Sequence, residues 1–154
     1  MNAEFINPFI KGLLNVMETM AQTTLKPGRP QRKSNEVAKG DVSGLIGMIG
    51  PETKGSLSIT FDESLALTIM ERMVGERPAK LDADVGDMVG EVTNMIAGSA
   101  KRDLADVGYD FGMATPVVVS GKDHTISHQV DGPKIILPFM CDEGSAHMEI
   151  CFDK

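Results

Sequence analysis

Cysteine and the larger aromatic residues are scarce in this sequence, whose 154 residues include no tryptophan, one tyrosine and two cysteines. Cys141 and Cys151 are too few for a disulfide framework and are typical of a reducing compartment. No stretch is apolar for long enough to cross a bilayer. The first residues lack the basic start and the small-residue cleavage site of a secretory signal. We therefore expect a cytoplasmic protein without membrane insertion.

An excess of positive charge is also missing, because 15 Lys and Arg stand against 22 Asp and Glu, a formal net charge of −7. A surface that binds nucleic acid needs clustered cations, so this balance argues against nucleic acid as a partner. Prolines and a glycine break the one basic stretch, which we expect to be a solvated loop entering a strand. Its cations are Lys26, Arg29, Arg32 and Lys33.

Common metal-binding and catalytic patterns are likewise absent from the sequence. His124, His128, His147 and Cys141 invite a metal site, but their spacing is not that of a zinc centre. Nothing in the sequence marks a base beside either cysteine, as a nucleophile would need. No glycine-rich phosphate loop follows a strand. We expect no metal site and no cofactor of the protein's own.

Hydrophobic periodicity predicts a single α+β domain over residues 1–154. Apolar residues recur at helical spacing over residues 3–25. Two further helices are expected at residues 62–75, with Gly75 as the stop, and from residue 82 or 84 to about residue 105. Strand-like segments separated by turn sequences lie at residues 41–49, 56–61, 117–120, 125–130, 134–140 and 147–152. Because strands and helices do not alternate, we expect long helices packed on a largely antiparallel sheet.

A faint internal repeat links the first and third predicted helices. When Asn15 is aligned with Asn94, the apolar positions of residues 9–17 and 88–96 largely coincide, and extended segments follow each helix. Such a repeat predicts two related halves packed about a pseudo-twofold axis. Chance similarity between two amphipathic helices is the alternative.

The third predicted helix has an apolar stripe opposite a polar face. At about 3.6 residues per turn, the stripe runs from Val85 to Ile96, and Asp87, Glu91 and Asn94 lie on the opposite side. Glu91 and Asn94 are three residues apart, so they are neighbours on one face. That face therefore presents an acidic group beside a carboxamide.

The residues around this pair are unusually small. Gly90, Ala97 and Gly98 surround it, although glycine within a helix costs about 1 kcal/mol relative to alanine. An ordinary solvent-exposed face explains Glu and Asn by themselves. A docking surface, cleared for a close approach, also explains the glycines.

The segment from Asp87 to Asn94, followed by Pro116, resembles the signature of the CheC/CheX/FliY family of chemotaxis phosphatases. That signature is Asp or Ser, three residues, Glu, two residues and Asn, with a proline downstream. The proline lies one residue closer here than in the usual pattern. The order of helices and strands is also similar to that of the family over nearly the whole chain.

Within this family, CheC-like members carry two copies of the motif and CheX-like members carry one. The repeat alignment places Gly12 of the first helix at the position of Glu91. Asn15 therefore lacks the partner that Glu91 provides for Asn94, and the first copy is expected to be inactive. The chain resembles the CheX-like members, with one site per chain.

The resemblance implies a phosphatase that acts on the phospho-aspartate of a CheY-type response regulator in chemotaxis signalling. Asn94 would orient the attacking water, and Glu91 would anchor the regulator through its active-site lysine. The Mg²⁺ of the reaction would belong to the regulator. The resemblance also implies a homodimer joined through edge strands. Asp87 is given no chemical role.

Two other functions stay open at this point. The same fold could serve as a non-catalytic chemotaxis or flagellar adaptor that binds a response regulator or another partner protein. It could also be a structural dimerisation domain, for which the Glu91 face would be dispensable. Asn94 distinguishes these functions, because an adaptor has no need of a carboxamide at that place.

Overall fold

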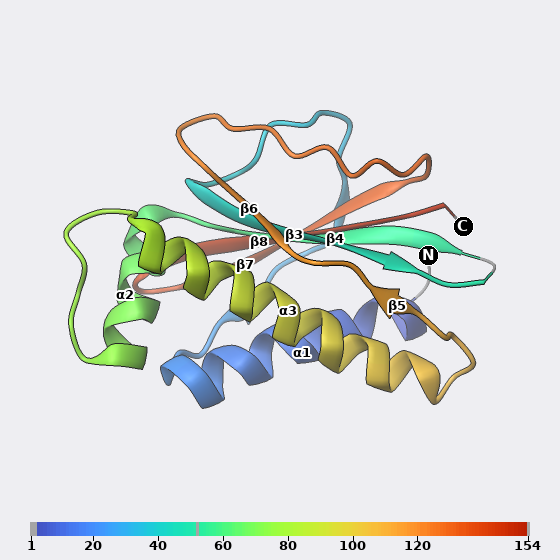
Figure 1. Cartoon of the computed structure of the whole chain (residues 1–154), viewed down its shortest axis with the longest axis horizontal. Helices are drawn as coiled ribbons and strands as arrows, with labels where there is room; N and C mark the ends of the chain where they lie inside the picture. Colours follow the sequence, from blue (N-terminus) through green and yellow to red (C-terminus); the bar gives the residue numbers. More distant parts are fainter. Residues whose placement is uncertain (1–2, 52, 154) are drawn as a thin grey trace.

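Three helices cover one face of an eight-stranded sheet in the computed structural model, which describes residues 3–51 and 53–153 (Figure 1). The helices are α1 (Ala3–Ala21), α2 (Glu63–Val74) and α3 (Ala83–Ala105). The long strands are β3 (Val42–Ile49), β4 (Lys54–Phe61), β7 (Lys134–Cys141) and β8 (Gly144–Phe152). The short strands are β1 (Lys26–Pro27), β2 (Gln31–Arg32), β5 (Gly112–Met113) and β6 (Val117–Ser120). The predicted α+β architecture is confirmed.

The sheet is antiparallel throughout and runs in the order β1-β7-β8-β4-β3-β5, with β2 also paired to β7 and β6 to β3. β4 and β8 meet at its centre, where Ser58 lies opposite Glu149. No helix among the described residues is both long and apolar enough to span a bilayer.

The two halves of the chain are arranged alike about the β4–β8 contact. Each half consists of a long helix, two short strands and a hairpin, and the short strands of each half pair with the hairpin of the other. The two ends of the central strand pair also match. The Asp62 N–H donates to the Ser145 carbonyl at 3.1 Å, and the Asp62 carboxylate accepts from the Ser145 N–H at 2.9 Å. In the same way, the Asp153 N–H donates to the Lys54 carbonyl and the Asp153 carboxylate accepts from the Lys54 N–H, both at 3.1 Å. This topology confirms the predicted pseudo-twofold arrangement.

The boundaries of α2 and α3 follow from their terminal residues. The Asp62 and Asp82 carboxylates accept the N–H groups of Leu65 and Val85, at 2.9 and 3.0 Å, and so cap the two helices. Gly75 ends α2 with a φ of 90°, a left-handed conformation that glycine adopts without strain. The predicted starts of both helices and the predicted stop of α2 are confirmed.

The first helix ends earlier than predicted, at Ala21 rather than at residue 25. Gln22 is left-handed, with a φ of 45°, and the Thr23 N–H donates back to the Met17 carbonyl at 3.0 Å. This hydrogen bond closes the helix in the manner of a glycine C-cap, although no glycine is present. Leu25 stays buried beyond the helix end, so its apolar periodicity continues without helical backbone.

The prediction of a strand over residues 125–130 is wrong. These residues form part of the connection between β6 and β7, and their only bridge in the described structure joins Val37 to Thr125. Ile126 and His128 are nevertheless buried, whereas Ser127 and Gln129 are exposed. The alternation that suggested a strand arises because this connection lies against the sheet and buries every second side chain.

The sheet buries an apolar face and a polar face. The core under the helices includes Leu57, Ile59 and Phe61 of β4 and their neighbours on β8. The residues between them, Ser56, Ser58, Thr60 and Glu149, are also buried but face the opposite side. The connections 33–41 and 121–133 cross that side (Figure 1). The two connections therefore cover the polar face of the sheet. The side of α3 that faces away from the sheet is left open.

Candidate functional site

The outer surface of α3 carries the residues singled out by the sequence. Asp87 and Glu91 are exposed, and Asn94 is partly exposed one turn further along. They lie at a shallow hollow of about 370 Å³ between α3 and the segment around β6. The residues that line it are Gly86, Asp87, Gly90, Glu91, Asn94, Pro116 and Val118. The structure thus brings the motif and the downstream proline together in one place.

The side chains of Glu91 and Asn94 are free to meet a partner. Within residues 3–51 and 53–153, neither the Glu91 carboxylate nor the Asn94 carboxamide has a hydrogen-bond or ion-pair partner. Asp87 lies one turn before Glu91 and is likewise exposed. Two carboxylates four residues apart on a helix repel each other, so a cation that binds between them relieves this repulsion. Because Glu91 has no ion-pair partner in the described part of the chain, such a cation would displace no other positive group from it.

The depth of α3 on the sheet is set by Gly44 of β3. A Cβ atom at this position would clash with the hydroxyl of Thr93 and lie 2.9 Å from its Cβ. Thr93 itself is fully buried, and its hydroxyl donates to the Val89 carbonyl at 2.7 Å. The turn that carries Glu91 and Asn94 is therefore held directly against β3.

The small residues around the site have different roles, which corrects the sequence-based interpretation. A Cβ at Gly90 would lie 3.3 Å from Val118 Cγ2, so this glycine makes room for β6 of the same chain. Ala97 is fully buried and does not belong to the outer face. A Cβ at Gly98 would meet no neighbouring atom within 4 Å, so Gly98 alone among these three residues has open space beside it. Only Gly98 fits the expected clearing.

The matching position in α1 is occupied by helix packing. Gly12 is buried, and a Cβ there would lie 3.2 Å from the Ile96 carbonyl oxygen of α3. Glu91 is exposed, so the two aligned positions differ in their surroundings. Asn15 is exposed on α1, but the exposed residue one turn before it is Lys11, which pairs with Asp103 at 3.4 Å. The first helix therefore presents no acid one turn before its asparagine, at the position that corresponds to Glu91.

Two of the three histidines, His124 and His128, are held by serines on the polar face of the sheet. His124 Nδ1 donates to the Gly121 carbonyl at 2.7 Å, so its Nε2 accepts from the Ser43 hydroxyl, also at 2.7 Å. His128 Nε2 donates to Glu149 at 3.1 Å, and its Nδ1 accepts from Ser56. Among the described residues, no group of three or more His, Cys, Asp or Glu could hold a metal ion.

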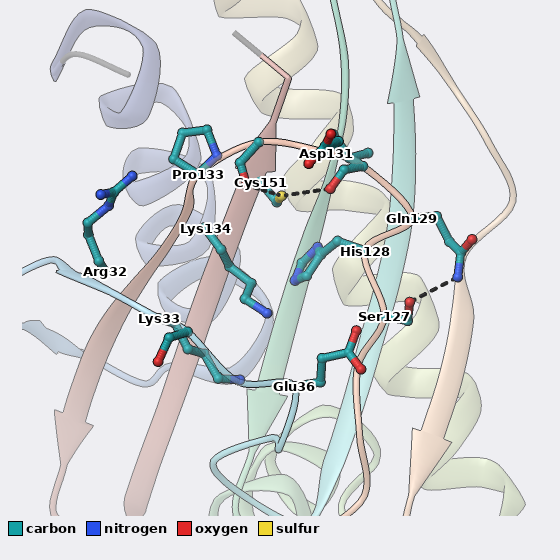
Figure 2. Close-up of a pocket in the computed structure, with 13 residues that line it drawn as sticks. Arg32, Lys33, Glu36, Ser127, His128, Gln129, Asp131, Pro133, Lys134 and Cys151 are labelled. Carbon is teal, nitrogen blue, oxygen red and sulfur yellow. Dashed lines mark hydrogen bonds between the residues drawn. The ribbon is translucent and has the colours of Figure 1, made fainter.

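Lys33 departs from the expectation of a solvated basic loop. Its side chain is 3% exposed and donates to Glu149, which is 0% exposed, at 2.5 Å. Burial alone would raise the pKa of Glu149, but the hydrogen bonds from His128 and Lys33 and the Lys33 charge outweigh it and lower that pKa. Lys33 and His128 line a cleft of about 760 Å³ (Figure 2).

Neither cysteine is suited to nucleophilic attack. Cys141 and Cys151 are both free thiols. Burial is the main cause that raises the pKa of each thiol, so the reactive thiolate is disfavoured. The Cys151 thiol also donates to backbone carbonyls of the connection before β7, those of Val130 and Gly132. Cys151 therefore acts in packing.

One site residue, Val118, was missed by reasoning from the sequence. It belongs to a run of three valines in which alternation cannot tell which side chain turns toward α3. Pairing with β3 settles this, since Val118 lies opposite Gly44, the residue on which α3 rests. The glycines at positions 86 and 90 were the available signal, because both face Val118.

The chain is similar to several known proteins. The family model described as chemotaxis phosphatase CheX matches residues 42–140. A CheC-like superfamily protein from Shewanella sp. PV-4 is 61% identical, with complete coverage of both chains and a TM-score of 0.95. The CheY-P phosphatase CheX of Thermotoga maritima is 28% identical over 124 residues, which are 80% of this chain and 79% of that protein.

A complex is also among the similar structures. The CheX–CheY–BeF3–Mg²⁺ complex from Borrelia burgdorferi contains a chain that is 27% identical, with a TM-score of 0.82 and coverage of 97% of this chain and 98% of that one. The matched family model runs from the start of β3 to the last residue but one of β7, and therefore includes every residue of the hollow. The chain belongs to the chemotaxis phosphatase CheX family.

Proposed function

We propose that this protein is a phosphatase that hydrolyses the phospho-aspartate of a CheY-type response regulator in chemotaxis signalling. The observation that carries the proposal is the pair of free side chains, Glu91 and Asn94, one turn apart beside Pro116. Membership of the CheX family supports it. So do the name of the Thermotoga maritima relative, a CheY-P phosphatase, and the Borrelia burgdorferi complex with CheY.

Asn94 is assigned to the attacking water. An acyl phosphate is hydrolysed when a water is held in line with the bond that breaks, so positioning supplies most of the catalysis. A carboxamide both donates and accepts hydrogen bonds and can orient water without removing a proton. Asn94 suits this role because it is only partly exposed and has no partner of its own among the described residues.

Glu91 is assigned to the docking of the regulator. Its exposed carboxylate would pair with the active-site lysine of the regulator and fix the approach of α3. The charge of Asp87, one turn away, adds to the attraction for a cationic site. The Mg²⁺ that neutralises the phosphoryl oxygens would be held by the regulator, and we propose no metal ligand on this chain.

We also propose that the protein forms a homodimer through an edge of its sheet. In the described residues β6 pairs with β3 on one side, and no strand pairs with its other side. An open backbone edge of this kind can pair with a second copy. Sedimentation analysis across a range of concentrations tests this, and a monomer at all concentrations would contradict it.

The phosphatase proposal is tested by following the decay of a phosphorylated CheY-type regulator. Wild-type protein should accelerate the decay. Asn94→Ala should lower kcat roughly 100-fold, the loss typical of a misplaced reacting group. Glu91→Ala should mainly raise KM, because Glu91 acts in docking. Asn15→Ala and Glu18→Ala, at exposed positions of α1, are matched controls and should behave as wild type.

The outcomes separate the candidate functions. No acceleration by wild-type protein, with binding of the regulator retained, would contradict the phosphatase and favour a non-catalytic adaptor. Acceleration that survives both Glu91→Ala and Asn94→Ala would refute the site and leave the activity. If neither the wild type nor any variant binds or dephosphorylates the regulator, the result would favour a structural dimerisation domain.

A further inference from the structure

The hollow beside Glu91 and Asn94 has an apolar wall that the motif does not include. Val118 is 36% exposed and lines the hollow, and Pro116 is the other non-glycine apolar residue that does so. The other side chains of the hollow belong to Asp87, Glu91 and Asn94, which are charged or polar. A partner that enters the hollow therefore meets polar groups on α3 and an apolar surface on the β6 side.

The position of Val118 is fixed by glycines of two elements. It pairs with Gly44 of β3, and its methyl groups lie over α3, 3.8 Å from a Cβ built at Gly86 and 3.3 Å from one built at Gly90. These two glycines are four residues apart and lie on the turn before Glu91. Any larger residue at position 90 would push Val118 outward, so α3 and β6 together set the depth of the hollow.

We infer that Val118 is a specificity-determining residue, a direct apolar contact that fixes how deeply a CheY-type regulator seats against α3. The inference rests on the proposed function. A carboxylate such as Glu91 attracts a cation from many directions and sets no depth, whereas a β-branched side chain is stiff and resists closer approach. Because Asn94 lies in the same hollow, the depth of seating determines whether its carboxamide reaches the water.

The neighbouring valine offers a matched control. Val117 is 56% exposed, but successive side chains of a strand point to opposite faces, so it lies on the side of the sheet away from α3. It does not line the hollow. Val118→Thr and Val117→Thr make the same change of shape and polarity in one strand, and threonine retains a high preference for strands.

The test measures binding and catalysis separately. Binding uses a CheY-type regulator activated with beryllofluoride and Mg²⁺, and catalysis uses the phosphorylated regulator. Val118→Thr should raise both Kd and KM roughly three- to tenfold, as expected for one apolar contact replaced by a hydroxyl, while thermal stability stays near that of wild type. Val117→Thr should leave Kd and KM unchanged.

A second variant guards against a purely structural effect. Val118→Ala removes the methyl groups without adding a polar atom, and it should also raise Kd while the melting temperature and the circular dichroism spectrum show a folded protein. An unchanged Kd in both Val118 variants, or equal effects in Val117→Thr, would overturn the inference. If wild-type protein binds but does not dephosphorylate the regulator, the phosphatase proposal fails, and the Kd values still decide the role of Val118.

Discussion

Replacing Glu149 with glutamine should destabilise the protein more than any change at its surface ion pairs. Glu149 is fully buried and accepts hydrogen bonds from Lys33 and His128 at 2.5 and 3.1 Å. Glutamine keeps the shape of the side chain but removes the charge, so Lys33 is left as a buried cation without its partner. Breaking a buried ion pair from one side costs about 3–5 kcal/mol. In a domain of this size that corresponds to a fall in Tm of roughly 6–20 °C.

The stability lost in Glu149→Gln should depend on pH. The folded-state pKa of Glu149 is lowered, so its contribution is fully present above the pKa of glutamate in an unfolded chain, about 4.3. It is lost as the pH falls below that value and through the lower folded-state pKa. The gap in unfolding free energy between wild type and Glu149→Gln should therefore be constant near neutral pH and shrink in acid.

Urea denaturation at pH 7 and below pH 4.3 measures both effects. The control is Asp103→Asn, because the Asp103–Lys11 pair is separated by 3.4 Å and partly exposed, and its loss should change stability by less than about 1 kcal/mol. Adding Lys33→Met to Glu149→Gln removes the stranded cation and should recover most of the loss. A Glu149→Gln variant within 1 kcal/mol of wild type at pH 7, or a double variant no better than the single one, would refute the reasoning.

Two further predictions concern α3 and the polar face. Gly44→Ala should push α3 away from the sheet at Thr93 and lower the free energy of unfolding, measured by urea denaturation, by about 1–3 kcal/mol. It should also slow dephosphorylation of the regulator, and an unchanged rate would show that the position of α3 is not critical. Burial, and then the nearby charge of Lys39, lower the pKa of His147, so stability should fall as the pH drops below about 6.5, where the unfolded chain binds the proton first. His147→Gln should flatten that slope in thermal unfolding between pH 7 and 5, and an unaltered slope would exclude His147 as its cause.

The elements with strong local signals were predictable from the sequence. The capping aspartates and Gly75 define α2 and the start of α3, and both are where local hydrogen bonding requires them. The hairpin between β7 and β8 follows from its turn sequence. The early end of α1 was not predictable, because Gln22 adopts a left-handed conformation that glycine or asparagine would normally signal.

Other features depend on contacts between segments distant in the sequence. The burial of Lys33 requires Glu149 from the last strand, so a local reading of the basic stretch could not find it. The mistaken strand at residues 125–130 has the same origin, since its alternation reflects burial against the polar face of the sheet. Glu91 and Asn94 could be placed on one face by helical spacing alone, whereas the role of Gly90 depends on Val118 of another element.

The packing of α1 explains why only one of the two aligned helix positions, 12 and 91, carries a glutamate, although the two halves of the fold are similar. The two long helices approach each other at Gly12, where a Cβ would lie 3.2 Å from a carbonyl oxygen of α3 and 3.5 Å from Ser99 Cβ. A glutamate at this position would have to enter the helix contact or push α1 away. The close approach of α1 supports α3 from one side, as Gly44 allows β3 to do from the other. The first half of the chain therefore contributes the support on which the Glu91 and Asn94 turn rests, and the glycine that permits this support excludes an acid from position 12, which corresponds to Glu91.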